Sequence, residues 1–257
     1  MTHPDFPDDR TAVLTGAASA RGIGRATADR LASQGWSIGI HEREASAAAT
    51  VAEEIAATHG VRALGVGADV ADAVAVDAAV SEIEAALPPA VGLVNLAGIS
   101  SPTEFMEETV EGWDQVFAVN MRGTFIVTQR VLRGMIDRQL GRIVSVSSVS
   151  AQRGGGTYSK VAYSASKAAI LGFTRALARE VGEHQGTVNA IAPGPIDTDI
   201  MGGTLSAERK QEMSAGTLVG RVGSPAEVAA LTAFLLGPDA GYITAATYDI
   251  NGGLQIS

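Results

Sequence analysis

Cysteine is absent from the sequence. Its absence excludes a disulfide framework, a Cys-ligated zinc site and a thiol nucleophile, and it is consistent with a reducing compartment such as the cytoplasm, where we expect the protein to work. The four histidines, His3, His41, His59 and His184, lack the spacing of metal ligands. We therefore expect them at the surface and predict no metal site.

Basic residues and long apolar runs are also scarce. Nineteen Lys and Arg stand against 28 Asp and Glu, a net charge of −9, which argues against binding to nucleic acid or to anionic lipid. Gly, Asp or Arg interrupts every apolar segment, so we predict no membrane-spanning helix. The first residues lack the cationic and apolar regions of a signal peptide.

Short apolar runs alternate along the chain with amphipathic stretches. The apolar runs predict strands at residues 12–15, 37–41, 62–67, 91–95, 142–147, 188–192 and 247–250. The stretches between them predict one helix that ends near residue 34 and further helices over 44–58, 72–87, 111–138, 161–181 and 225–236.

This order of elements predicts an α/β protein with a Rossmann-type, doubly wound parallel sheet and helices on both faces. Ligands bind such a sheet outside the carboxyl ends of its strands. The chain has 257 residues, 46% of them hydrophobic, and no interdomain linker. We therefore expect a single domain over residues 1–257.

A glycine-rich turn follows the first predicted strand. Its glycines, Gly16, Gly22 and Gly24, allow the backbone to approach a pyrophosphate, which the N-terminus of the next helix attracts. Glu42 stands 18 positions beyond Gly24, about where a carboxylate meets the 2′-hydroxyl of an adenosine ribose. A turn that binds nothing and a solvated glutamate on a surface helix are the alternatives, and the context favours a dinucleotide.

Two arginines near this turn complicate the choice of cofactor. Arg21 and Arg43 are possible partners for the 2′-phosphate of NADP(H), whereas the carboxylate of Glu42 repels that phosphate. We predict NAD(H) as the preferred cofactor and keep NADP(H) as the alternative.

Tyr163 and Lys167 stand at positions i and i+4, which share one face of a helix. A tyrosine with its ordinary pKa of about 10 is a poor base at neutral pH, and a nearby ammonium lowers that pKa. A serine cluster that includes Ser148 and Ser150 ends the fifth predicted strand, where a parallel sheet places its ligands. An exposed helix pair and serines that cap a turn are the alternatives.

Taken together, these motifs resemble the short-chain dehydrogenase/reductase family over essentially the whole chain. The matches, in the family's order, are Thr15-Gly16, Gly22-Ile23-Gly24, Asp69-Val70, Asn95-Leu96-Ala97-Gly98, Asn120, Ser148, Tyr163 with Lys167, Pro193-Gly194 and Asn251-Gly252-Gly253. The resemblance implies an enzyme that transfers hydride between a nicotinamide cofactor and a secondary alcohol or its ketone.

The resemblance also implies roles for the matching residues. Tyr163 is expected to exchange a proton with the substrate oxygen, Ser148 to polarise that oxygen, and Lys167 to depress the Tyr163 pKa and hold the nicotinamide ribose. Asn120 is expected to anchor a water that extends the proton relay. Besides Tyr163 and Lys167, the residues expected to bind the cofactor are Gly16, Ser19, Arg21, Gly22, Ile23, Gly24, Glu42, Arg43, Asp69, Val70, Asn95, Ala97, Gly98, Pro193, Ile196 and Thr198. Among them, Asp69 and Val70 are expected to flank the adenine, and Asn95, Ala97 and Gly98 to line the cofactor and brace the sheet.

The chain departs from the family pattern in its loops. The glycine turn is two residues longer than usual, and 15 residues separate Ser148 from Tyr163, also two more than usual. Ser150, at the usual interval, is the reserve candidate for the role of Ser148. Leu96 replaces a usual asparagine. Residues 199–218 are expected to form a substrate lid, with a plain surface connection as the alternative.

The first functional hypothesis is an oxidoreductase for a small polyol, sugar or other hydroxy compound. The alternative is a 3-oxoacyl-[acyl-carrier-protein] reductase, which grips its acidic carrier with two arginines; those positions hold Gln139 and His184 here. A dinucleotide-binding protein without turnover is a third hypothesis, which the complete set of catalytic residue types argues against. The resemblance further implies a homo-oligomer, a tetramer or a dimer, formed through the helices near 115–138 and 161–181.

Overall fold

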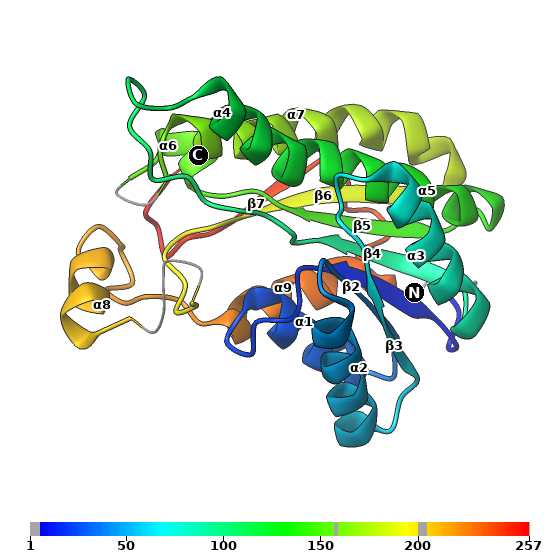
Figure 1. The fold of residues 1–257 in the computed structure, drawn as a ribbon. Coiled ribbons are helices and arrows are strands. Elements are labelled where there is room, and N and C mark those ends of the chain that lie inside the picture. Colours follow the sequence, from blue (N-terminus) through cyan, green and yellow to red (C-terminus); the bar gives the residue numbers. More distant parts are fainter. Residues whose placement is uncertain (1–5, 157–158, 200–204, 257) are drawn as a thin grey trace.

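The structure is a computed structural model, and it describes residues 6–156, 159–199 and 205–256. Within these residues, seven parallel strands form one sheet in the order β3-β2-β1-β4-β5-β6-β7 (Figure 1). The strands are β1 (Thr11–Thr15), β2 (Ser37–Glu42), β3 (Ala63–Gly67), β4 (Ala90–Asn95), β5 (Gly141–Val146), β6 (Gly186–Pro193) and β7 (Thr247–Ile250). The Rossmann-type parallel sheet predicted from the sequence is confirmed.

Helices cover both faces of the sheet (Figure 1). On one face lie α1 (Ile23–Ala32), α2 (Ala45–His59) and α9 (Pro225–Leu236), and on the other lie α3 (Ala73–Ala86), α4 (Val110–Phe117), α5 (Gly123–Asp137) and α7 (Val161–Val181). Neighbouring strand residues point to opposite faces, so Leu14 packs in the core beside α1, α2 and α9, and Val13 in the core beside α3, α5 and α7. In the described part of the chain, no helix is long and apolar enough to cross a membrane.

The order of the strands reverses between β1 and β4, which are neighbours in the sheet. Such a reversal opens a crevice at the carboxyl ends of the strands. The turn after β1 and the loop after β4 meet there, because Thr15 Oγ1 accepts hydrogen bonds from the backbone N–H groups of Leu96 and Ala97, at 3.1 Å each. Gly16 has a φ of +80°, and a Cβ on it would lie 2.8 Å from Ala97 N. Only glycine suits this position.

The long helix predicted over 111–138 is divided into α4 and α5 by a π-helical turn at Ala118–Arg122. A π turn has i→i+5 hydrogen bonds within an otherwise α-helical stretch, and the apolar pattern did not distinguish it from a continuous α-helix. Two shorter helices are α6 (Ser150–Arg153) and α8 (Ala207–Ser214). Helix α8 lies within the predicted lid, of which residues 200–204 fall outside the described part. Figure 1 shows α8 set apart from both helix layers.

His41 shows that the prediction of surface histidines was wrong for one of them. It is fully buried in β2, where its Nε2 lies 3.1 Å from the carbonyl oxygen of Ala68, and burial lowers its pKa. Strand β2 is covered on both faces, so the polar side chain of His41 is buried there like its apolar neighbours. His59 and His184 are half-buried, and His3 lies outside the described residues.

Candidate active site

A groove with a volume of about 770 Å³ lies at the carboxyl ends of the strands, and this size is typical of ligand sites. The predicted site residues that line it are Gly16, Ser19, Gly22, Ile23, Gly24, Glu42, Ala97, Gly98, Ser148, Tyr163, Lys167, Pro193, Ile196 and Thr198. The predicted site residues outside its lining are Arg21, Arg43, Asp69, Val70, Asn95 and Asn120. The fold thus brings residues from both halves of the chain to one edge of the sheet.

The glycine turn presents the start of α1 to the groove. The N-cap of α1 is Gly22, which has no side chain to bind the backbone N–H groups of the first turn. Such a helix N-terminus attracts an anion through these N–H groups and through the helix dipole. A Cβ on Gly24 would collide with the carbonyl oxygen of Gly16, so the turn packs against α1 only with glycine there. These features fit the pyrophosphate of a dinucleotide.

Glu42 lies at the end of β2 and is half-buried. Its Oε1 accepts a hydrogen bond of 2.5 Å from the backbone N–H of Ala18 in the glycine turn. Burial raises the pKa of the carboxyl group, and hydrogen bonds from backbone N–H groups oppose that shift. The carboxylate is therefore held at the groove by the same turn that would hold the pyrophosphate.

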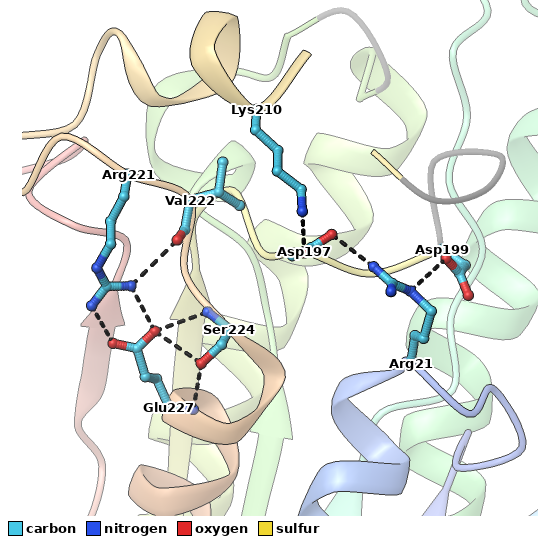
Figure 2. Close-up of polar contacts among 8 residues, drawn as sticks. All are labelled: Arg21, Asp197, Asp199, Lys210, Arg221, Val222, Ser224 and Glu227. Atoms are coloured by element: carbon cyan, nitrogen blue, oxygen red, sulfur yellow. Dashed lines mark hydrogen bonds and ion pairs between the residues drawn. The ribbon is translucent and has the colours of Figure 1, made fainter. Parts of the chain in front are cut away.

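Both predicted arginines lie outside the lining of the groove that contains Glu42. Arg21 donates from Nη2 to Asp197 Oδ1 at 2.9 Å and from Nε to Asp199 Oδ1 at 3.1 Å (Figure 2). Arg43 is 78% exposed and lies 3.4 Å from the carboxylate of Glu44. Both guanidinium groups are paired with carboxylates of this chain.

Tyr163 and Lys167 lie on one face of α7 and line the groove. Lys167 is 4% exposed, and its Nζ donates to the carbonyl oxygen of Val146 at 2.8 Å and lies 5.8 Å from the centre of the Tyr163 ring. Burial lowers the pKa of Lys167 to about 8 and raises the pKa of Tyr163, while a hydrogen bond with Ser148 opposes the latter shift. Burial and Ser148 account for the Tyr163 pKa shift in this structure, and the expected depression by Lys167 stays a prediction.

Ser148 and Ser150 both line the groove, but they have different surroundings. The side chain of Ser148 hydrogen-bonds to Tyr163, and its Oγ also accepts a hydrogen bond of 3.1 Å from the backbone N–H of Ser150. Ser150 begins α6. The geometry therefore favours Ser148 over the reserve candidate Ser150 as the partner of Tyr163.

Asn120 lies in the π-helical turn and is fully buried. Its Oδ1 accepts from the N–H of Ile99 at 2.8 Å, and its Nδ2 donates to Ile99 O and Ser166 Oγ, at 3.0 Å each. The side chain thus joins the loop after β4 to α7. A Cβ on Gly98 would lie 3.2 Å from Asn120 Oδ1 and 3.3 Å from Lys167 Nζ, so the two side chains border one small space. The expected water at this place stays a prediction.

Three other predicted cofactor residues have structural contacts. Asn95 Nδ2 donates to Thr128 Oγ1 at 2.9 Å and to Ser145 Oγ at 3.2 Å, so it braces β4 against α5 and β5, as expected, but does not line the groove. Asp69 Oδ1 accepts from the N–H of Ala71 at 2.8 Å. Val70 is buried against α5. Adenine contacts by Asp69 and Val70 stay a prediction.

Apart from Ser150, the remaining groove residues were not among the predicted site residues. They are Ala18, Leu96, Ser100, Val146, Ser147, Val149, Gly155, Gly156, Ser159, Gly194, Pro195, Asp199, Arg209, Glu212, Met213 and Leu254. Arg209, Glu212 and Met213 come from α8, in the predicted lid, and Gly155 comes from the longer interval between Ser148 and Tyr163. Loop length alone indicated these segments, and no pattern of residue types distinguished the lining positions. Among the described residues, no group of His, Asp or Glu has the geometry of a metal site.

Comparisons with known proteins agree with this geometry. A family model described as enoyl-(acyl carrier protein) reductase matches residues 16–255. The chain is 39% identical to the uncharacterized short-chain type dehydrogenase/reductase y4mP of Sinorhizobium fredii, over 96% of this chain and 98% of the relative. It is 42% identical to the 3-oxoacyl-[acyl-carrier-protein] reductase FabG of Aquifex aeolicus, over 95% and 97%. A crystal structure of 3-oxoacyl-[acyl-carrier protein] reductase from Brucella melitensis, 32% identical, matches with a TM-score of 0.90 over 98% of this chain and 97% of that one.

Proposed function

This chain belongs to the short-chain dehydrogenase/reductase family of nicotinamide-dependent oxidoreductases, and we propose that it uses NAD(H) to interconvert a small secondary alcohol and its ketone. The observation that carries the choice of cofactor is the position of Glu42. Its carboxylate lines the groove and binds the glycine turn through Ala18. A carboxylate at this position accepts hydrogen bonds from the hydroxyl groups of an adenosine ribose and repels a 2′-phosphate.

The reaction follows from the groups around Tyr163. When bound, the nicotinamide supplies or accepts a hydride at the substrate carbon. In the reductive direction the Tyr163 hydroxyl gives its proton to the substrate oxygen, and the hydroxyl of Ser148 stabilises the charge on that oxygen. The raised pKa of Tyr163 keeps the hydroxyl protonated before the transfer.

The oxidative direction requires Tyr163 to accept a proton. Lys167, with its pKa of about 8, carries a positive charge at neutral pH. Its ammonium lies 5.8 Å from the centre of the tyrosine ring and stabilises the phenolate through space. Lys167 thereby makes the same tyrosine usable as a base.

Polar groups in the lining of the groove support a small hydroxylated substrate. Ser100 and Ser159 line the groove together with Arg209 and Glu212 from α8. Such side chains hydrogen-bond to hydroxyl groups of a polyol, a sugar or a hydroxy acid.

A second candidate substrate is a 3-oxoacyl thioester on an acyl carrier protein, which the names of the relatives from Aquifex aeolicus and Brucella melitensis favour. At the two positions where carrier-gripping arginines are expected, Gln139 Nε2 and His184 Nδ1 lie 2.9 Å apart, and Glu183 lies 3.5 Å from the same histidine. Because neither position holds an arginine and a carboxylate lies beside them, this surface attracts an acidic carrier weakly. We therefore place this substrate second.

The test is a comparison of turnover with both substrate classes. The protein is assayed with NAD⁺ and a panel of polyols and secondary alcohols, and with NADH or NADPH and a 3-oxoacyl thioester, free and on an acyl carrier protein. We expect NAD⁺-linked oxidation of at least one small alcohol, lost in Tyr163→Phe. Turnover of the carrier-bound thioester alone would replace the first substrate class by the second, and turnover that survives in Tyr163→Phe would contradict the mechanism.

We also propose a homo-oligomer. Helices α4 and α5 expose apolar side chains, among them Val110 (72% exposed) and Phe125 (44% exposed). A hollow at these helices is lined by Phe117, Ala118, Met121 and Phe125 together with the polar Glu111, Asp114, Gln115 and Arg122, and a second copy can bury such a face. Light scattering at micromolar concentration is expected to give a tetramer or a dimer, and Phe125→Glu is expected to lower the mass. A wild-type monomer would contradict the proposal. We expect the cytoplasm as the location, as the sequence predicts.

A further inference from the structure

Four charged side chains link the glycine turn to the segment after β6 and to α8 in the predicted lid (Figure 2). We call Arg21, Asp197, Asp199 and Lys210 the ion-pair cluster. Arg21 binds Asp197 and Asp199, and Lys210 Nζ on α8 donates to Asp197 Oδ2 at 2.6 Å. The two acids follow β6, far in the sequence from Arg21. Two acids and two bases make the cluster neutral as a whole.

These contacts hold the guanidinium of Arg21 beside Asp197 and Asp199. Its Nε and Nη2 each donate to a different carboxylate, and the side chains involved are between 27% and 43% exposed. Charge-assisted hydrogen bonds to two acids hold a planar guanidinium in a defined orientation. The same turn carries Ala18, whose N–H binds the Glu42 carboxylate. The glycine turn thus binds the Glu42 carboxylate through its backbone, while its own cation, Arg21, is bound by Asp197 and Asp199.

We infer that Asp197 and Asp199 are cofactor-selecting residues, because they hold Arg21 away from the adenosine 2′ position and leave Glu42 to determine the charge there. This inference rests on the proposed function, since it places a dinucleotide in the groove. Lys210 has a positioning role, because it binds the same carboxylate as Arg21. Neither acid was singled out by the sequence, and neither has to touch the 2′ position to act on it.

Removal of the two acids is expected to release Arg21 toward a 2′-phosphate. Ion pairs between partly exposed groups are individually weak, so each change alters affinity by a few fold and the two together by about tenfold. A free guanidinium pairs well with a phosphate dianion. The affinity for NADP(H) is therefore expected to change more than the affinity for NAD(H), which has a hydroxyl in place of the 2′-phosphate.

The experiment measures the dissociation constants of NADH and NADPH by nicotinamide fluorescence, without substrate. For Asp197→Asn/Asp199→Asn we expect the ratio of the NADPH constant to the NADH constant to fall about tenfold from the wild-type ratio. Adding Arg21→Ala to this variant is expected to return the ratio to within about twofold of the wild type. The matched control is Asp9→Asn, which removes an acid from the exposed Arg62–Asp9 pair outside the groove and is expected to leave the ratio unchanged.

The outcomes separate this inference from the proposed function. If the wild-type protein prefers NADH and the ratio of dissociation constants is unchanged in Asp197→Asn/Asp199→Asn, the inference alone is overturned. A shift that persists after Arg21→Ala, or that Asp9→Asn reproduces, also overturns it, because the cause is then Arg43 or net charge. Wild-type protein that binds neither cofactor, or that prefers NADPH, overturns the proposed function and the inference together. Thermal melting of each variant verifies that it is folded.

Discussion

Two parts of the groove are held together by different forces. The proposed catalytic corner consists of Ser148, which follows β5, and of Tyr163 and Lys167 on α7, and its side chains are buried or half-buried. The ion-pair cluster is partly exposed. Burial changes pKa values and makes each contact costly to lose, whereas exposed ion pairs are weak and screened by salt. Substitutions at the catalytic corner therefore test the proposed proton transfer, and substitutions at the ion-pair cluster test the choice between NAD(H) and NADP(H).

The largest effect is expected from Tyr163→Phe, which removes the proton donor of the catalytic corner and leaves the ring in place. General acid–base catalysis contributes about 10²- to 10⁴-fold, so kcat is expected to fall by that factor, measured by nicotinamide absorbance. The NADH dissociation constant serves as the control and is expected to change by less than about threefold. A kcat within a few fold of the wild type would remove Tyr163 from the mechanism.

The next effect distinguishes the two serines. Ser148→Ala removes a hydroxyl that hydrogen-bonds to Tyr163, and kcat is expected to fall about 10²-fold, as for the loss of one donor to a developing oxyanion. Ser150→Ala is the matched control, and its kcat is expected to stay within about threefold. The opposite pattern would assign the role to Ser150.

A smaller effect concerns the stability of the catalytic corner at alkaline pH. The pKa of Lys167 is lowered by burial to about 8, so the unfolded chain binds more protons than the folded protein between that pH and the ordinary lysine pKa of about 10.4. Lys167 therefore destabilises the fold at pH 7, and this cost disappears as the pH rises through that window. Relative to Lys167→Met, the wild-type Tm is expected to rise between pH 8 and 10. A constant difference would show that the ammonium is not desolvated.

The smallest effect concerns an ion pair outside the groove lining, which is drawn beside the ion-pair cluster in Figure 2. Glu227 binds Arg221 and completes the capping box of α9 with Ser224, which lowers its pKa to about 2. A depressed folded-state pKa gives stability that is present above the ordinary glutamate pKa and lost as the pH falls toward 2. The wild-type Tm is expected to fall more steeply than that of Glu227→Gln between pH 4.5 and 2. Parallel curves would show that the pair is too exposed to matter.

The sequence predicts the sheet and the proximity of Ser148, Tyr163 and Lys167 well, for physical reasons. Strands that are buried on both faces are continuous apolar runs, and glycines or charged residues mark their ends. The strands accordingly begin and end within two residues of the prediction. Tyr163 and Lys167 were found because a helix brings positions i and i+4 to one face.

Long-range contacts could not be predicted in the same way. Arg21 is 176 residues from Asp197 in the sequence, and no local pattern indicates that they meet. For this reason the sequence left Arg21 as a competing phosphate partner. The burial of His41 and the contacts of Asn120 likewise depend on elements that only the folded chain brings together.

The central claim is that the groove binds NAD(H) in preference to NADP(H) because of Glu42. Its most direct test is a paired calorimetric titration of the wild-type protein and Glu42→Ala with NADH and NADPH. The account predicts that the wild type binds NADH at least tenfold more tightly than NADPH, and that Glu42→Ala loses most of this difference. Tighter binding of NADPH by the wild type, or a preference that Glu42→Ala leaves unchanged, would contradict it.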